Sequence, residues 1–423
     1  MFVGAPPLKV LLCGACMSGN MGGPALYLGM HEACRLLEVP VAITVLSKYP
    51  DDDAAPCAAA GGPMISFTSG RQLTRAAPLS LFYAGLRCVG LMPRRSRSDF
   101  MQAALSHDVL IDLSGISFTD ERDVSGLVIN VLWLLPALAT GLPFVKAAQA
   151  MGPFRRPLVR WVSRFVLGRA AALAARGAES AAHLRALLPG RAISQLDDLA
   201  FLMPPAAPAE VEAALVELGL ARERGYCVLA PSLAVYHMAS VVQRERYIAL
   251  YAAIASHAED HYGLEVLLLP HERAHGEGGV DDVMVCERVR AVAPQRCWAL
   301  LRRTVSAPLL KGLVGGAQFA LGSRFHFMVA AMGSGVPGIA IGWSHKYREM
   351  MDAFEQGHYA VDFRLASSDE IRVQLDGLWH ARTGIRATLC ARRVMVCERA
   401  AQNAVLAIAA ARRTAVPAAT TAS

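Results

Sequence analysis

The chain has 423 residues, of which 54% are hydrophobic and 18% are charged, and this composition excludes collagenous, low-complexity and disordered chains. Forty-two Lys and Arg against 35 Asp and Glu give a net charge of +7, which favours anionic partners but is too low for a dedicated nucleic-acid binder. At this length a single hydrophobic core usually splits, so we expect two domains.

The ten cysteines and 16 methionines follow no disulfide framework, which indicates a reduced, intracellular setting. We interpret the pair Cys13-Gly-Ala-Cys16 as the buried end of a strand rather than as a redox or metal motif. The uncharged stretch 124–145 has the length of a membrane span. Because Pro136 and Pro143 interrupt it, we expect a buried helix, a turn and a strand instead.

Strand-like and helix-like segments alternate in the amino-terminal half of the chain. A polar segment rich in Asp, Gly and Pro, 49–63, is expected to be a loop. The alternation is typical of a parallel sheet with helices on both faces. We expect strands at 9–13, 42–46, 109–113, 144–148 and 171–174, and helices at 24–37, from 124 and from about 156.

The alternation restarts after a Pro- and Ala-rich break at 203–208. We expect helices at 210–218 and 244–257, strands at 226–230, 264–270, 297–300, 319–321 and 338–341, and a loop at 271–282. The predicted fold is α/β, with two Rossmann-like domains whose parallel sheets face an interdomain cleft. Because ligands sit beyond the carboxyl ends of such strands, the cleft is the expected site.

The predicted domains are an amino-terminal one at 1–205 and a carboxyl-terminal one at 206–415. We expect the last helix to pack back on the amino-terminal domain. The Ala- and Thr-rich tail, 416–423, is expected to be frayed.

Two motifs of the amino-terminal domain follow predicted strands with small and polar residues. The glycine-rich segment Ser18–Ala25 opens a helix, where backbone N–H groups can approach an anion, although a tight turn without a ligand explains it equally well. Further on, Ser114, Asp120 and Arg122 could face a polyhydroxylated ligand, or the carboxylates could cap the following helix. The sequence leaves both alternatives open.

Arginine is concentrated in one segment, since eight arginines and one acid lie between Arg155 and Arg191. Arg156, Arg160 and Arg164 recur every four residues beside apolar side chains, which predicts a helix with one cationic and one apolar stripe. A solvated face explains the cationic stripe, and so does a surface that touches anionic lipid or a lipid-linked diphosphate.

Two further arginines lie near predicted strand ends. Arg176 follows a short strand, and its planar fork matches a carboxylate or phosphate unless it pairs with a neighbouring acid. In Leu321-Gly-Ser-Arg-Phe-His326, Arg324 and His326 share one side if the strand continues through them. A fixed cation beside a titratable imidazole is suited to a site that binds an anion and transfers a proton. The alternative is that His326 is a core histidine whose ring nitrogens form hydrogen bonds within the protein.

A series of short motifs follows one fixed order along the chain: Gly-Asn-x-Gly at 19–22, Ser114-Gly115, Gln149-x-x-Gly-Pro-Phe154, Arg176 with Ser180, Asp197-Asp198-x-Ala-Phe201, Ser323-Arg-x-His326, Gly335-Val-Pro337 and His345-Lys-Tyr347. Taken in this order, the motifs resemble the polysaccharide pyruvyltransferase family over most of the chain, from about Lys9 to Asp362. The chain departs from the family pattern at Gly23 and Gly177, where family members often carry an acid.

The resemblance implies a fold similar to two-domain GT-B glycosyltransferases. It also implies an enzyme that moves pyruvate from phosphoenolpyruvate to two hydroxyls of a sugar, forming a cyclic ketal during polysaccharide or glycolipid synthesis in the cytoplasm. Arg176 and Arg324, from opposite domains, would hold the carboxylate and phosphate of this donor, and His326 would protonate its methylene or assist phosphate departure. The other implied contacts are Ser323, His345 and Lys346 with the donor, and Asn20, Ser114, Asp120 and Arg122 with the acceptor.

Two other classes of function fit the same sequence: a GT-B nucleotide-sugar glycosyltransferase, whose arginines would hold a diphosphate, and a non-catalytic scaffold on a membrane surface. We expect phosphoenolpyruvate as a co-substrate, no further cofactor, no metal and no nucleic-acid partner. His271 and His275 have HxxxH spacing, but without a certain third ligand a mobile loop near the cleft explains them better. A sugar acceptor and a peripheral contact of Arg156, Arg160 and Arg164 with the inner membrane surface complete the expected partners.

Overall fold

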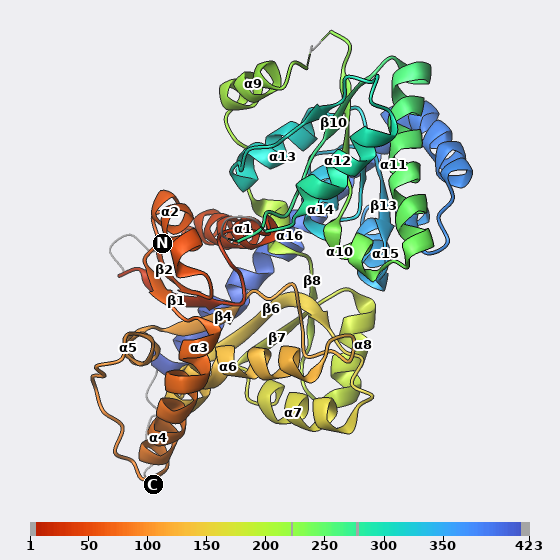
Figure 1. The fold of residues 1–423 in the computed structure, drawn as a ribbon. Coiled ribbons are helices and arrows are strands. Elements are labelled where there is room, and N and C mark those ends of the chain that lie inside the picture. Colours follow the sequence, from red (N-terminus) through yellow and green to blue (C-terminus); the bar gives the residue numbers. More distant parts are fainter. Residues whose placement is uncertain (1–5, 221–222, 276–278, 416–423) are drawn as a thin grey trace. The chain divides into compact units, whose positions relative to one another are not determined.

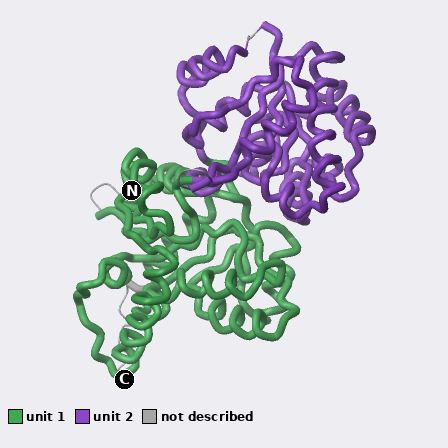
Figure 2. Tube along the Cα trace, in the orientation of Figure 1, with its two compact units in different colours: residues 1–18, 26–202, 398–423 green, residues 19–25, 203–397 purple. Residues whose placement is uncertain are grey.

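The chain forms two compact units in a computed structural model that describes residues 6–220, 223–275 and 279–415 (Figure 1). Unit 1 takes in Met1–Ser18, Leu26–Leu202 and Glu398–Ser423, and unit 2 takes in Gly19–Ala25 and Met203–Cys397 (Figure 2). The glycine-rich turn therefore belongs to unit 2, although the strand before it belongs to unit 1.

Unit 1 is built on a parallel sheet of order β3-β2-β1-β4-β6-β7-β8, with β5 paired to β6. Its central strands are apolar runs buried on both faces, as a parallel sheet covered by helices requires. The strands are β1 (Leu8–Cys13), β2 (Val41–Ser47), β3 (Met64–Ser66), β4 (Val109–Asp112), β5 (Ile116–Ser117), β6 (Phe144–Met151), β7 (Ala172–Arg176) and β8 (Ser194–Leu196).

Helices connect these strands. Helix α1 begins in the turn that belongs to unit 2 and continues into unit 1. The helices are α1 (Gly22–Leu36), α2 (Pro50–Ala59), α3 (Ser69–Arg71), η1 (Gln72–Ala76), α4 (Ala77–Cys88), α5 (Asp99–Ser106), α6 (Val124–Thr140), α7 (Pro157–Leu167), α8 (Ala178–Leu187) and η2 (Leu199–Leu202).

The uncharged stretch that has the length of a membrane span is a helix, a turn and a strand, as predicted. Asp123 caps α6 by accepting a hydrogen bond from the backbone N–H of Gly126 at 3.1 Å. The helix ends at Gly141, whose φ of 85° lies in the left-handed region that glycine tolerates best. The predicted polar loop at 49–63 is wrong in part, because Pro50 opens α2 and three aspartates fill its first turn, where they complement the helix dipole.

Unit 2 repeats the architecture with a parallel sheet of order β11-β10-β9-β12-β13-β14. Its strands are β9 (Tyr226–Ala230), β10 (Glu265–Leu268), β11 (Ala299–Leu300), β12 (Ala320–Gly322), β13 (Gly338–Gly342) and β14 (Ala360–Asp362). Its helices are α9 (Pro208–Glu217), α10 (Leu233–Met238), α11 (Val241–Tyr262), α12 (Asp282–Val292), α13 (Ala307–Gly315), α14 (Phe325–Gly333), α15 (His345–Asp352), η3 (Gly357–Tyr359) and the first part of α16 (Ser368–Ala415).

Both sheets reverse their strand order beside their first strand. In unit 1, β1 lies between β2 and β4, and in unit 2, β9 lies between β10 and β12. This is the order of doubly wound Rossmann-like folds, which bind ligands at the carboxyl ends of the strands where the order reverses. The predicted fold class of two Rossmann-like domains is confirmed, and the topology points to the ends of β1 and β4 and of β9 and β12.

The long helix α16 packs within both units. Arg386 donates to the carbonyl of Ala317 in unit 2 at 2.8 Å, and Asn403 accepts from the backbone N–H of Ala148 in unit 1 at 2.8 Å. By length and composition alone α16 could also cross a membrane, and 39% of its most apolar window is buried in the fold. Its Leu389 and Val396 are fully buried, which is the behaviour of a core helix. The tail predicted to be frayed lies outside the described residues.

Candidate functional site

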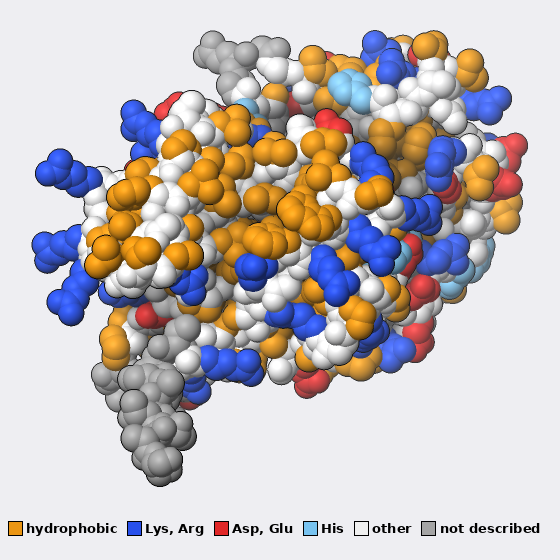
Figure 3. Space-filling model, turned by 90° about the horizontal axis from the view of Figure 1, so that it is seen from below, with side chains coloured by type: hydrophobic (Ala, Val, Ile, Leu, Met, Phe, Trp, Pro, Cys, Tyr) orange, Lys and Arg blue, Asp and Glu red, His pale blue; other side chains and the backbone are white. Residues whose placement is uncertain are grey.

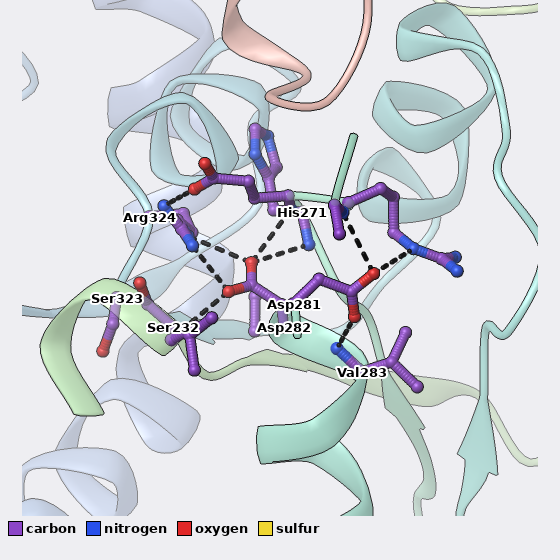
Figure 4. A network of polar contacts seen from close by, with 12 residues as sticks. Ser232, His271, Asp281, Asp282, Val283, Ser323 and Arg324 are labelled. Atoms are coloured by element: carbon purple, nitrogen blue, oxygen red, sulfur yellow. Dashed lines mark hydrogen bonds and ion pairs between the residues drawn. The ribbon is translucent and has the colours of Figure 1, made fainter. Parts of the chain in front are cut away.

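Arg324 lies in the turn between β12 and α14, at the point where the strand order of unit 2 reverses (Figure 4). The strand ends at Gly322, Arg324 is the N-cap residue of α14, and His326 lies in the first turn of that helix. This corrects the expectation that one strand carries Arg324 and His326 on the same side.

The guanidinium of Arg324 is fixed by a buried carboxylate. Its Nε donates to Oδ2 of Asp282 at 3.0 Å and its Nη2 donates to Oδ1 at 2.6 Å. Asp282 is fully buried and also accepts from the backbone N–H groups of Leu233 and Glu272 at 2.8 and 2.9 Å. Burial alone would lower the pKa of Arg324, but Asp282 and Glu272 outweigh burial and raise it. The cation is therefore permanent and its plane is set.

The remaining terminal nitrogen of Arg324, Nη1, pairs with the carboxylate of Glu272. The side chain of Glu272 is 39% exposed, whereas that of Arg324 is 11% exposed. Such a carboxylate keeps much of its hydration and forms a weaker pair than the buried one. An anionic ligand could take its place on the guanidinium without disturbing Asp282.

Two buried polar atoms at neighbouring strand ends have no hydrogen-bond partner among the described residues: Oγ of Ser232 and Nδ1 of His271. Ser232 follows β9 and His271 follows β10, and both are at most 2% exposed. Buried polar atoms are normally satisfied by protein, water or a ligand. Their position beside Arg324 makes the ends of these strands the candidate ligand site of unit 2 (Figure 4).

His271 is held in its neutral form. Burial, and after it the neighbouring His326 and Arg324, lower its pKa well below the ordinary value of a histidine. The sequence predicts His271 only as part of a mobile loop, yet its backbone N–H donates to Asp282 and the described start of the loop is anchored. In the described parts of the chain, no cluster of His, Cys, Asp and Glu could hold a metal ion.

The glycine-rich turn contributes to the same place. Gly22 lies against the imidazole of His326, since a Cβ atom at Gly22 would come within 2.1 Å of its Nδ1. Asn20 forms a β-bridge with Glu272, and its side-chain oxygen accepts from the backbone N–H of Gly22 at 2.8 Å. The turn therefore brings Asn20, which is predicted to contact the acceptor, close to His326 and to Glu272.

The other residues predicted to contact the donor already have protein neighbours. Ser323 is buried, and its hydroxyl lies 2.9 Å from that of Tyr251. His345 lies in the first turn of α15, 3.8 Å from Glu349. The ammonium of Lys346 lies over the ring of Trp343, 4.9 Å from its centroid. The hydroxyl of Ser323 therefore has a hydrogen-bond partner within the protein, and Ser323, His345 and Lys346 stay predicted donor contacts.

In unit 1, Arg176 ends β7 and pairs with the buried carboxylate of Asp198. It also donates to the carbonyl of Gly115 at 2.9 Å. The sequence leaves two alternatives open for Arg176, and the structure shows one of them, the pairing with an acid of the protein, Asp198. The next residue, Gly177, has a φ of 96°, a backbone conformation that glycine adopts more readily than other residues.

The end of β4 and the first half of β6 hold a buried ion pair that sequence analysis missed. Nζ of Lys146 lies 2.5 Å from Asp112, with both side chains at most 1% exposed, and it also donates to Ser117 at 3.0 Å. Asp112 also accepts from the backbone N–H of Ser114 at 2.8 Å. The available sequence signal was a single charged residue in each of two apolar strands. This signal is weak, because nothing in the local sequence shows that the two residues pair.

The loop after β5 is tied to the start of α7. Asp120 accepts from the backbone N–H of Arg155 at 2.5 Å and that of Arg156 at 3.3 Å. Arg122 is exposed, and its carbonyl accepts from the guanidinium of Arg156. For Asp120 the structure thus shows a backbone-capping role, although the capped segment is that before α7 rather than α6.

The thiols of the CxxC pair carry no sign of redox activation. Cys13 is buried at the end of β1, and burial, followed by the charge of Asp112, raises its pKa well above the ordinary value. Burial, followed by Asp53, raises the pKa of Cys16 to about 11. Reactive cysteines have lowered pKa values, so the structure agrees with a buried strand end.

Comparison with solved structures shows which known folds are similar. The chain superposes on a UDP-GlcNAc 2-epimerase from Neisseria meningitidis with a TM-score of 0.58 and 9% identity, covering 95% of this chain and 100% of the epimerase. A glycosyltransferase from Rickettsia africae gives a TM-score of 0.54 and 10% identity, with 97% of each chain covered. At such low identity the likeness shows the two-domain fold of these enzymes and nothing of their substrates.

Comparison with family models gives a more specific result. The model described as polysaccharide pyruvyl transferase matches residues 46–345, which is well over half of the chain and includes Arg176, Arg324 and His326. No curated protein matches the sequence.

Proposed function

This chain belongs to the polysaccharide pyruvyl transferase family, and from that membership we propose that it transfers pyruvate from phosphoenolpyruvate to two hydroxyls of a sugar. The products would be a cyclic ketal on a polysaccharide or glycolipid precursor and inorganic phosphate. We propose the cytoplasm as the place of the reaction, in keeping with the ten cysteines of the chain.

The observation that carries the proposal is the fixed guanidinium of Arg324 beside two unpartnered buried polar atoms. Phosphoenolpyruvate has a phosphate and a carboxylate, and a guanidinium bonded twice to Asp282 still offers Nη1 to such an anion. Displacing the half-exposed Glu272 from Nη1 would open this position. Ser232 and His271 would then donate to or accept from the polar atoms of the donor.

In the proposed reaction His326 gives a proton to the methylene carbon of the donor, which becomes a methyl group. The adjacent carbon becomes electrophilic and is stabilised by its oxygen. One sugar hydroxyl adds to this carbon and loses its proton, phosphate leaves with the C–O bond electrons, and the second hydroxyl closes the ring with loss of its proton. Arg324 would neutralise the phosphate as it leaves.

The remaining predicted contacts complete this proposal. Arg176 would add a second cation for the donor through the guanidinium that Asp198 orients, and His345 and Lys346 would line the donor position. Asn20 is the predicted acceptor contact with the clearest support, because it lies in the same network as Glu272. Ser114, Asp120 and Arg122 remain proposed acceptor contacts.

The proposal is tested by incubating the protein with phosphoenolpyruvate and a panel of hexosides while inorganic phosphate is measured. Phosphate release that requires a hexoside, together with a mass gain of the sugar that corresponds to a pyruvate ketal, is the expected result. Thermal unfolding provides a second test, because a ligand at about 100 times its Kd stabilises a protein by roughly 2.7 kcal/mol. Stabilisation by a nucleotide sugar, with none by phosphoenolpyruvate, would identify a glycosyltransferase instead.

A further inference from the structure

Three neighbouring helical segments of unit 1 expose an unusual amount of apolar surface. Helix α4 packs against α6, and α6 packs against α7. Figure 3, a view from below relative to Figure 1, shows apolar side chains gathered on one face with Lys and Arg side chains among and around them. The exposed apolar side chains of these helices and of the residues flanking α4, each at least 43% exposed, are Leu73, Leu81, Phe82, Val89, Leu91, Val124, Val128, Leu158, Trp161 and Phe165.

Helix α7 shows the pattern most clearly. Its inner face buries Val159 and Val166, while its outer face presents Trp161 at 69% exposure and Phe165 at 48%. The two exposed rings stack with their centroids 6.2 Å apart. A tryptophan rarely stays this exposed on a freely solvated helix, whereas its amphipathic ring is favoured at the interface between water and lipid.

Within α4, α6 and α7 every charged side chain is an arginine, and the acids Asp99 and Asp123 lie outside these helices. Residues 54–98 contain six arginines and residues 155–169 contain five, with no Asp or Glu in either segment, although the whole chain has a net charge of only +7. Arg160 and Arg164 are exposed, and no acidic side chain among the described residues pairs with them. Arg156, which the sequence predicts as part of the cationic stripe, instead donates to the carbonyls of Asp120 and Arg122.

We propose that the outer face of α4, α6 and α7 docks unit 1 on a membrane that contains anionic lipids. The arginines would meet lipid phosphates and the exposed aromatic and aliphatic side chains would enter the interface, which is the combination found in helices that lie on membranes. A second copy of the chain fits less well, because a symmetric contact would place arginines against arginines. This proposal does not depend on the proposed reaction.

Cosedimentation of the full chain with lipid vesicles tests the proposal. We expect binding to phosphatidylcholine vesicles that contain phosphatidylglycerol, much weaker binding to phosphatidylcholine alone, and a loss of binding as salt is raised. The variant R160Q/R164Q should bind roughly 30-fold more weakly, from the usual contribution of each basic residue near an anionic surface. The variant W161S/F165S should also lose most of its binding.

The matched control carries the same types of change in unit 2. V241S/V242S/R246Q alters two exposed valines and an exposed arginine of α11, and it should bind vesicles as the wild type does. All the changed side chains are exposed, so thermal unfolding should shift little in any variant. Phosphate release with a water-soluble sugar should also be unchanged, which separates this test from that of the reaction.

Three results would overturn the proposal. The first is vesicle binding by W161S/F165S that equals that of the wild type, and the second is an equal loss of binding in the α11 control. The third is a concentration-dependent dimer, measured by sedimentation equilibrium, that W161S/F165S dissociates. That result would assign the face to a contact between copies of the chain.

Discussion

Arg324 and Asp282 form a two-point ion pair across 42 positions of sequence, with both nitrogen to oxygen distances at or below 3.0 Å. Both carboxylate oxygens of Asp282 accept hydrogen bonds from backbone N–H groups. The backbone therefore holds this carboxylate in place, and the carboxylate in turn orients the guanidinium of Arg324. An ion pair of this kind presents the remaining nitrogen of Arg324 in one orientation. The proposed donor site depends on this orientation as much as on the charge.

Replacing Arg324 by Lys should therefore reduce donor turnover strongly. Lysine keeps the charge but cannot bond Asp282 at two points while offering a third nitrogen. We expect kcat/KM for phosphoenolpyruvate to fall by about 100-fold or more, from the usual effect of losing a charged hydrogen-bonded contact. The control R303K alters an arginine that pairs with Glu217 on the surface, and it should change kcat/KM less than about twofold.

Replacing His326 by Ala should remove the proposed general acid. Loss of such a group usually lowers the rate by about 10²- to 10⁴-fold. The measurement is single-turnover phosphate release at saturating donor, with the exposed His358 changed to Ala as a control. A variant that keeps more than about a tenth of wild-type turnover would exclude His326 from this role.

Replacing Glu272 by Gln should ease binding of the donor. The exposed carboxylate competes with an incoming anion for Nη1 of Arg324, and an amide competes less well. The KM for phosphoenolpyruvate should fall several-fold, with little change in kcat. E287Q, which removes a carboxylate from the exposed pair with Arg302, is the matched control. A raised KM in E272Q would instead mean that Glu272 contacts the substrate directly.

His271 should make folding stability depend on pH. Its folded pKa lies well below the ordinary value, so below a pH of about 6.5 the unfolded chain binds a proton that the folded chain does not. The contribution of the neutral His271 to the free energy of unfolding is therefore fully present above that pH and is lost as the pH falls. Between about pH 7.5 and 5.5 this single group should cost about 1.4 kcal/mol of the free energy of unfolding.

Urea unfolding of the wild type and H271Q at both pH values measures this contribution. The variant should lose less stability on acidification than the wild type, by about the stated amount. H358Q, at an exposed histidine, should behave as the wild type. Equal losses in all three proteins would contradict a neutral buried His271.

The fold was largely predictable because its strands are short apolar runs between turn residues. The strand predicted at 226–230 has the observed bounds of β9. Within the uncharged stretch, α6 and β6 are separated at Gly141 to Pro143, whereas Pro136 lies inside the helix. The loop prediction at 49–63 failed at the aspartates after Pro50, because Asp is common in loops but is also favoured in the first turn of a helix.

The candidate site was predictable only in part. The residues Arg324 and His326 stood out locally, but the partner of Arg324 lies 42 positions away and no local pattern marks Asp282. His271 and Ser232 directly follow apolar runs, and placing them at the carboxyl ends of adjacent strands could have identified them. The ion pair of Arg176 with Asp198 likewise depends on tertiary structure.

Helix α16 also has a consequence for how the protein is made. A ribosome synthesises β1 to β8 first, yet Asn403 and Arg399, which bond Ala148 and Asp197 of unit 1, are added only after the strands of unit 2. The nascent first unit thus emerges without this part of α16, and these groups stay uncovered until the whole of the second sheet has been synthesised.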